Sequence, residues 1–442
     1  MQLTQESARK KIVFWIYVFY VLMIIEGALR KWVLPEAAMV SFFVRDPVVF
    51  YIYFLAIQNK LWPARKGLFA AATWIFAAYI VVIALQMLFL QVNPLVYLYG
   101  LRIYFLLIPL AFIMKDCLKG EDVKVIILIT MLLAIPMAGL VYEQFHQPKT
   151  HWINKTLNED LTHTAMMTAD IVRPSGTFSD GRLFVYFIAS AFALTLPQWL
   201  LENSQRVLKL PLLAICSASI VCCLAYNGNR TSWIMVGVCI VFAAASIFIV
   251  RSRAARINAL IGFLAIFLLS GALGCYVFSS GIAAMLERQE MAVKYEGDTL
   301  KRVISMASAE GLENIPWYGR GIGLGSGGGK KIAGYSGWLL AEREIERNAQ
   351  EAGVFSLLFI GFRIALTFFI FSEAIKATRR SNNPTPLVIF GFCLPLLTIG
   401  LITIVGTIQA YGWFFAGLNM AANNFGKAKA LPEEAKMRPQ TA

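Results

Sequence analysis

The chain has 442 residues, of which 58% are hydrophobic and only 15% are charged, and its mean hydropathy is +0.64. This balance excludes an ordinary soluble domain, because the apolar residues occur in runs long enough to span a bilayer. The formal net charge of +14 does not indicate a nucleic-acid partner, since Lys and Arg are scattered among the ends of apolar runs and form no basic arm. We expect an all-α, multi-pass membrane protein with a single integral membrane domain over residues 1–442.

The apolar runs predict the membrane helices in chain order. The first, Ile12–Leu29, follows the basic stretch Arg9–Lys11 and precedes no convincing cleavage site, so we expect an uncleaved helix that enters from inside. Further runs lie at 38–57, 67–90, 98–114, 125–141, 183–201, 210–226, 233–250, 257–278 and 352–374. The last run, 386–422, is too long for one span, and its interior glycines divide it into two. About twelve membrane helices result.

The charges of the connecting loops predict which side each faces. Every loop expected inside is basic, as the positive-inside rule requires. These loops carry Lys60, Arg65, Lys66, Lys115, Lys119, Lys124, Arg206, Lys209, Arg251, Arg253, Arg256, Lys376, Arg379 and Arg380. Both termini, including the polar tail 425–442, are then cytoplasmic. The two polar intervals, 142–182 and 279–350, become outer loops, and the larger lies between the ninth and tenth helices.

Several kinds of chemistry lack their usual motifs. No inside loop is long enough for a catalytic domain, and the GxGxxG at Gly323–Gly328 follows no expected strand, so ATP-driven transport and dinucleotide binding are not indicated. All three histidines (His146, His151 and His163) lie in the outer loop 142–182 without metal-ligand spacing. Seven cysteines lie mostly inside apolar runs, as packing residues do. We expect neither a metal nor a cofactor.

Cations at the outer face break the charge rule. They are Arg30, Lys31, Arg45, Arg102, Arg173, Arg182, Arg230, Arg302 and Arg320. Each can pair with a nearby acid such as Glu26, Asp46 or Asp180, or can reach lipid headgroups. As a set they outnumber those acids, and charges beside membrane spans usually pair, line a cavity or bind a ligand. Because Arg donates bidentately to phosphate, the set predicts an anionic ligand such as a lipid-linked diphosphate.

The large outer loop offers further candidates. Asp298 can cap a surface helix from Thr299, and the Gly-rich stretch from Ile315 to Lys331 predicts non-helical backbone, either a lid or a phosphate cradle. A helical pattern resumes at Trp338. On it Glu344, Asn348 and Glu351 share one face, and Arg343 and Arg347 share another. Carboxylates there are candidates for a general base, or else belong to a solvated surface helix.

Three short motifs resemble the O-antigen ligase and O-antigen polymerase superfamily. One is Arg-x-x-Gly-Thr-Phe before a span, at Arg173–Phe178, and another is the arginine turn Asn229–Thr231. The third is Arg302 followed by Pro316 and the Gly-x-Gly of 319–323 in a large outer loop. The layout of about twelve helices also agrees.

This resemblance implies a metal-independent glycosyltransferase of a bacterial inner membrane, active at the periplasmic face. It would move a glycan from an undecaprenyl diphosphate carrier to an acceptor hydroxyl, in the bilayer and alongside other polysaccharide-assembly proteins. The resemblance implies that Arg173, Arg230 and Arg302 hold the diphosphate, and Arg102 and Arg320 join them as outer cations. Ligases carry a histidine near the tenth helix, where this chain has Glu346, Asn348 and Glu351 instead. We take these three as the catalytic candidates.

That departure favours a polymerase of O-antigen or exopolysaccharide over a ligase proper. A different class stays open, namely a multi-pass transporter of a small anion such as bicarbonate, because an arginine-lined cavity serves it equally. The absence of a visible inverted repeat and the concentration of polar sequence on one face argue against transport. An inactive scaffold of a polysaccharide-assembly complex is the third possibility.

Overall fold

The computed structural model describes residues 2–36, 43–63, 67–155, 171–296, 315–334 and 343–425. Within these ranges every regular element is helical. The α-helices are α1 (Gln2–Ala28), α3 (Asp46–Gln58), α4 (Gly67–Phe89), α5 (Pro94–Phe105), α6 (Ile108–Cys117), α7 (Gly120–His146), α8 (Gly181–Leu200), α9 (Leu210–Asn227), α10 (Arg230–Ile249), α11 (Arg253–Ala272), α12 (Ser279–Glu296), α14 (Gly327–Ala333), α15 (Glu344–Ala352), α16 (Ser356–Ser381), α17 (Thr385–Thr398) and α18 (Gly406–Ala422). Short 3-10 or π turns are η1 (Leu29–Val33), η2 (Trp152–Asn154), η4 (Asn203–Gln205), η5 (Leu273–Val277) and η7 (Gly353–Phe355).

The expected helical bundle is confirmed. Nine helical segments of the described residues are long and apolar enough to cross a membrane. Each predicted apolar run contains at least one helix, but α3, α17 and α18 have only 13, 14 and 17 residues. The number of crossings and the side that each end faces stay predictions.

Prolines and glycines set the breaks between helices. We expected one helix over 98–114, but the structure has two consecutive helices there, α5 and α6. Pro109 stands at the start of α6, where it lacks an N–H that a continuous helix would need. The final run divides as predicted, into α17 and α18, and the intervening turn 399–405 later contributes to the site.

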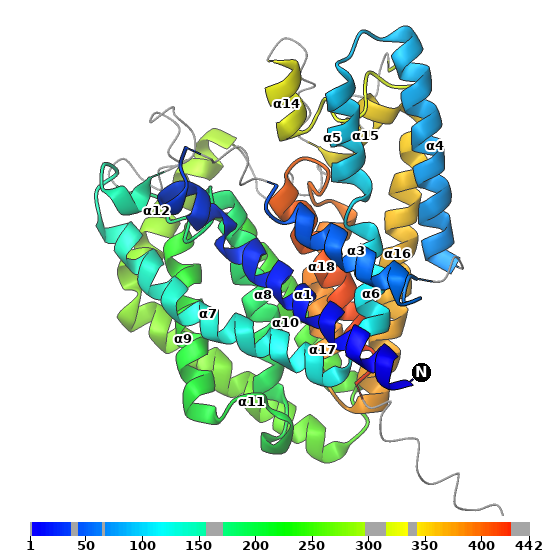
Figure 1. Cartoon of the computed structure of the whole chain (residues 1–442). Helices are drawn as coiled ribbons and strands as arrows, with labels where there is room; N and C mark the ends of the chain where they lie inside the picture. The colour runs from blue at the N-terminus through cyan, green and yellow to red at the C-terminus, as the bar shows by residue number, and fades with distance from the viewer. Residues whose placement is uncertain are drawn as a thin grey trace, which may run out of the picture.

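Helix α18 forms the centre of the bundle. All of its residues except Thr407 are buried. A Cβ at Gly417 would lie 2.8 Å from Cα of Ala111, so the small residue lets α18 and α6 approach closely. In Figure 1, α4, α5, α14, α15 and α16 gather on one side of this centre, and α7, α9, α11 and α12 lie on the other.

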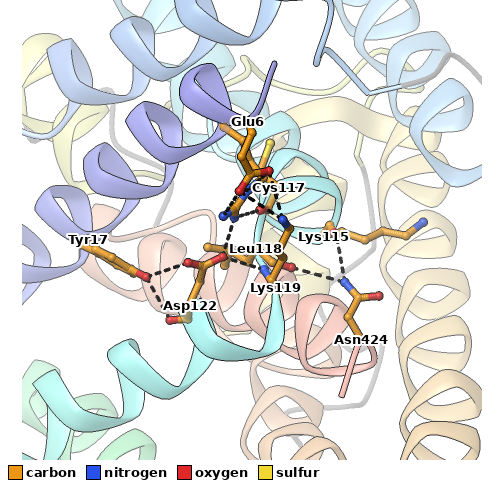
Figure 2. Close-up of polar contacts among 9 residues, drawn as sticks. Glu6, Tyr17, Lys115, Cys117, Leu118, Lys119, Asp122 and Asn424 are labelled. Atoms are coloured by element: carbon orange, nitrogen blue, oxygen red, sulfur yellow. Dashed lines mark hydrogen bonds and ion pairs between the residues drawn. The ribbon is translucent and has the colours of Figure 1, made fainter. Parts of the chain in front are cut away.

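One end of the bundle collects segments predicted to lie inside. Arg9 Nη1 donates to the Asp122 carboxylate at 2.6 Å and to the Cys117 carbonyl at 2.8 Å. Asn424 Nδ2 donates to the Leu118 carbonyl at 3.4 Å, and Figure 2 shows these contacts around the turn between α6 and α7. The N-terminus of α1, the α6–α7 turn and the end of α18 therefore share one end, as their basic residues predict.

The two polar intervals contain more helix than expected. Helix α7 continues to His146, and α12 was not predicted at all. The prediction that the Gly-rich stretch contains no helix is wrong at its end, because Ser326 Oγ accepts from Gly329 N at 3.0 Å and caps α14. The surface helix expected from Thr299 lies outside the described residues.

Candidate functional site

The segment Arg173–Phe178 forms a turn that is held by α7. Gly176 has a φ of 55°, in the left-handed region that glycine adopts without strain. Gln144, which is buried in α7, brackets the turn: its Oε1 accepts from Ser175 N at 3.0 Å and from Gly176 N at 2.8 Å. The polar backbone of this turn is therefore satisfied inside the protein rather than by water.

The same turn is held from the other side by α1 and η1. Thr177 Oγ1 donates to the Ile24 carbonyl at 2.6 Å. Gly27 faces the turn so closely that a Cβ there would lie 2.4 Å from the Thr177 carbonyl oxygen. Lys31 Nζ donates to Ser175 Oγ at 3.0 Å and to the Gly176 carbonyl at 2.8 Å. Helices α1 and α7 thus fix the backbone that carries Arg173.

The structure brings Arg173 and the Arg230 turn together at the start of α8. Asn227 Nδ2 donates to the Gly181 carbonyl at 3.2 Å, and Asn229 caps α10, of which Arg230 is the first residue. A Cβ at Gly181 would lie 3.1 Å from Cγ of Arg173, so the stem of that arginine packs along Gly181. Arg173 and Arg230 are both half-buried.

Asp180 and Arg182 begin α8. The Asp180 carboxylate accepts from Arg182 N at 2.7 Å and pairs with the Arg182 guanidinium at 2.7 Å. Burial alone would raise the pKa of Asp180, but the hydrogen bonds from Arg182 outweigh it and hold that pKa below its ordinary value. Arg182 therefore anchors the helix start.

Three arginines share two carboxylates between α1, α3 and α5. Glu26 forms ion pairs with Arg45, whose Nε lies 2.6 Å from its carboxylate, and with Arg30, whose Nη1 lies at 3.6 Å. Asp46 receives Arg102 bidentately, at 2.5 and 2.8 Å. Arg102 was a candidate for binding an anionic ligand, but in the structure it pairs with the nearby acid Asp46.

An apolar groove of about 770 Å³ lies beside this cluster. Its walls come from α3, α4, α5 and α6, and Ile332 of α14 also lines it. Asp46 and Arg102 are the charged residues among its described lining. Phe50 and Leu98 line it and are 59% and 65% exposed, so the groove opens onto the surface that would face lipid.

Helix α15 presents a buried polar face. Glu344, Arg347, Asn348 and Glu351 are each at most 1% exposed. The prediction that Arg347 lies on a different face from Glu344 is wrong, because positions three, four and seven residues apart all point into the protein here. This helix is not a solvated surface helix.

Glu344 lies at the centre of an ion cluster that joins four segments. Its Oε1 accepts from Arg363 Nη1 of α16 at 2.8 Å and from Thr403 Oγ1 at 3.0 Å, and its Oε2 pairs with Arg347. Arg363 also donates to the Leu397 carbonyl at 3.0 Å. The cluster ties α15 to α16, to the end of α17 and to the turn 399–405.

Two of the catalytic candidates are engaged in holding the fold. Glu351 accepts from Gly325 N at 2.7 Å and from Gly323 N at 3.1 Å, so its carboxylate anchors the Gly-rich stretch. Asn348 Oδ1 accepts from Tyr104 OH at 2.8 Å. These contacts favour structural roles for both. Glu346 is half-buried and accepts only from Gln350 Nε2, at 3.1 Å, among the contacts that the structure describes.

The Gly-rich stretch packs against α5 by close backbone approach. Gly323 has a φ of 94°, and a Cβ there would lie 2.3 Å from the Val96 carbonyl oxygen. A Cβ at Gly325 would lie 2.3 Å from Cδ of Arg347. Arg320 is exposed on this stretch, and its N–H donates to the Gln350 carbonyl at 2.7 Å. This close packing favours a fixed Gly-rich stretch over a mobile lid.

Some of the predicted residues cannot be placed. Arg302 and His163 lie outside the described residues. Among those the structure does describe, no group of three or more His, Cys, Asp or Glu side chains could hold a metal ion. No family model, curated protein or solved structure matches the chain. The resemblance therefore rests on the three sequence motifs.

Sequence reasoning missed the residues that support the site. Gln144 and Arg363 are polar residues within otherwise apolar helices, and that contrast was a usable signal. Tyr104 and Thr403 carried no comparable signal, because a lone Tyr or Thr in a membrane segment is ordinary.

Proposed function

We propose that the chain is a membrane glycosyltransferase that moves a glycan from undecaprenyl diphosphate to an acceptor hydroxyl, as a polymerase in O-antigen or exopolysaccharide assembly. The observation that carries this proposal is the apolar groove lined by Arg102 and open on the lipid-facing surface. An isoprenoid chain fits an apolar groove, and a diphosphate fits arginines, which suits a lipid with an anionic head. We place it in a bacterial inner membrane with a periplasmic active face.

Residues 26–31 connect the groove to the turn that carries Arg173. Glu26 holds Arg45 next to the Asp46–Arg102 pair, and Lys31 holds Ser175. Glu26 and Lys31 lie five residues apart on the continuous helical segment of α1 and η1, an axial rise of at most about 7.5 Å. A carrier with its chain in the groove would thus meet several cations at its head.

In the proposed reaction the acceptor oxygen attacks the anomeric carbon of the glycan. The bond from that carbon to the diphosphate oxygen breaks, and the diphosphate leaves with the electron pair. Arg173, Arg230 and Arg302 would stabilise its charge. The acceptor proton would pass to Glu346, the catalytic candidate whose carboxylate has the fewest described partners.

Polymer synthesis in cells lacking the chromosomal copy tests this proposal. Arg173→Ala, Arg230→Ala and Arg302→Ala variants should insert normally and lose polymer. Full-length polymer from all three would contradict the mechanism. Thr73→Phe, which fills the groove, should also reduce synthesis, whereas Val81→Phe, at an exposed position two turns farther along α4 and outside the groove lining, should not.

Two other functions give different outcomes. Anion transport is favoured by one observation, the buried ion cluster around Glu344 in a candidate span, because such clusters occur on ion paths. Anion uptake into proteoliposomes that contain only this chain would support it. Turnover with a lipid-linked oligosaccharide separates the polymerase from an inactive scaffold, and transfer to a lipid acceptor would identify a ligase instead.

A further inference from the structure

Helix α5 contacts both the apolar groove and the Gly-rich stretch. Leu98 and Tyr99 of this helix line the groove. The next residue, Gly100, faces the Gly-rich stretch so closely that a Cβ there would lie 2.9 Å from Gly323 N. One short helix therefore separates the groove from the backbone that Glu351 anchors.

Helix α14 reaches the groove from the Gly-rich stretch. Its Ile332 lines the groove and is 37% exposed. Its first turn lies on α5, as Figure 1 shows, because a Cβ at Gly328 would be only 2.3 Å from Cζ of Tyr99. A chain bound in the groove would thus contact α14 through Ile332 and its support on α5 through Tyr99.

Buried hydrogen bonds connect α14 to α15. Ser326 Oγ accepts from Gly329 N at 3.0 Å, which caps α14, and donates to the Gly323 carbonyl at 2.6 Å. Gly323 N in turn donates to the Glu351 carboxylate of α15 at 3.1 Å. Ser326 and Glu351 are both fully buried, so breaking these bonds would leave polar groups unsatisfied away from water. The two helices therefore move as one unit.

We infer that Ile332 is a positioning residue: the polyprenyl chain of the carrier packs against it, holds α14 on α5, and through Ser326 and Glu351 holds α15 in place. This inference rests on the proposed function. A ligand shifts an equilibrium only toward the state that it binds more tightly, and a chain in the groove contacts Ile332 only while α14 lies on α5. Binding of the chain therefore fixes the helix that carries Glu346, the proposed base.

Hydrogen exchange of the full chain in lipid nanodiscs tests this inference, with undecaprenol, the uncharged alcohol of the carrier chain, as the probe. The proposed function requires the probe to slow amide exchange in α5. The inference predicts that it also slows exchange in α14 and α15. At about ten times its Kd, a probe that must leave before α14 opens slows exchange through that opening by about tenfold.

Substitutions on α14 show whether Ile332 carries the effect. Ile332→Ala removes the contact and leaves the groove walls from α3, α4 and α6 intact. Undecaprenol should still slow exchange in α5 of this variant, but the slowing in α14 and α15 should be lost. Ile332→Leu keeps the apolar volume and should restore it. Lys331→Ala is the matched control, because Lys331 is an exposed neighbour on the same helix and is not among the described groove lining.

Each outcome decides a specific point. If undecaprenol slows exchange in α5 of the wild type but not in α14 and α15, the inference is wrong and the proposed function stands. Slowing in α14 without α15, or equal slowing in the wild type and Ile332→Ala, also overturns the inference. If exchange in α5 is unchanged, the groove does not hold the carrier chain and both fail together. Should Ile332→Ala not fold, the wild-type comparison of the three helices still decides.

Discussion

Glu344 and Arg363 form an ion pair of 2.8 Å between α15 and α16, with side chains only 1% and 3% exposed. Glu344 also pairs with Arg347, so one carboxylate serves two buried guanidinium groups. Through Arg363 the pair reaches the carbonyls at the end of α17. It therefore fixes the helix that carries Glu346 to the membrane bundle beneath it.

Removing this carboxylate should be strongly destabilising. Glu344→Ala leaves Arg347 and Arg363 buried without their acid, and breaking a buried pair from one side costs about 3–5 kcal/mol. Thermal unfolding in detergent should show a large drop in midpoint. Glu373→Ala removes the exposed pair with Lys376 on the same helix, and it should change stability by less than about 0.5 kcal/mol. Equal losses of stability for the two variants would contradict a large contribution from the buried pair.

Gly27→Ala should displace the Arg173 turn. The new methyl would lie 2.4 Å from the Thr177 carbonyl oxygen and 2.7 Å from Ser179 N, and backbone atoms cannot rotate away. We expect a loss of about 1–3 kcal/mol together with weaker diphosphate binding. Gly139→Ala on α7, where nothing lies within 4 Å of the new Cβ, should be neutral or slightly stabilising. Normal stability and binding for Gly27→Ala would argue against a fixed turn.

Gly323→Ala should loosen the Gly-rich stretch from α5. It combines a positive φ with a Cβ only 2.3 Å from the Val96 carbonyl oxygen. Gly334→Ala has a positive φ but open space, so it measures backbone strain alone, about 1–3 kcal/mol. Unfolding midpoints should fall further for Gly323→Ala. A smaller fall than that of Gly334→Ala would contradict the close packing.

Stability should depend on the ionisation of Asp180 at acidic pH. Because its folded pKa is depressed, Asp180 stabilises the protein above its unfolded pKa of about 3.9, and this contribution is lost as the pH falls through the folded value. Asp180→Asn keeps a side-chain cap but no charge, so it should lose this part of the pH dependence. Unfolding midpoints from pH 6 to pH 3 test this, and identical curves for the two proteins would refute it.

The sequence by itself determined most of the apolar helices and the grouping of basic helix ends at one end of the bundle. Apolar runs must be buried or face lipid, so each of them became helical, although 98–114 broke into two helices, and basic segments such as those at Arg9 and Lys119 met at one end. The RPSGTF and NGNRT motifs were also visible, because Gly and Asn impose local turns whatever surrounds them.

Only the tertiary structure decided which charges are ligand candidates and which are structural. Whether Arg102 pairs with Asp46, or Arg347 turns inward beside Glu344, depends on packing between helices distant in the chain, which periodicity alone does not encode. The same packing assigned Glu351 to the Gly-rich stretch and Lys31 to the Arg173 turn. Residue types are local, but the partner of a buried charge is set by the neighbouring helix.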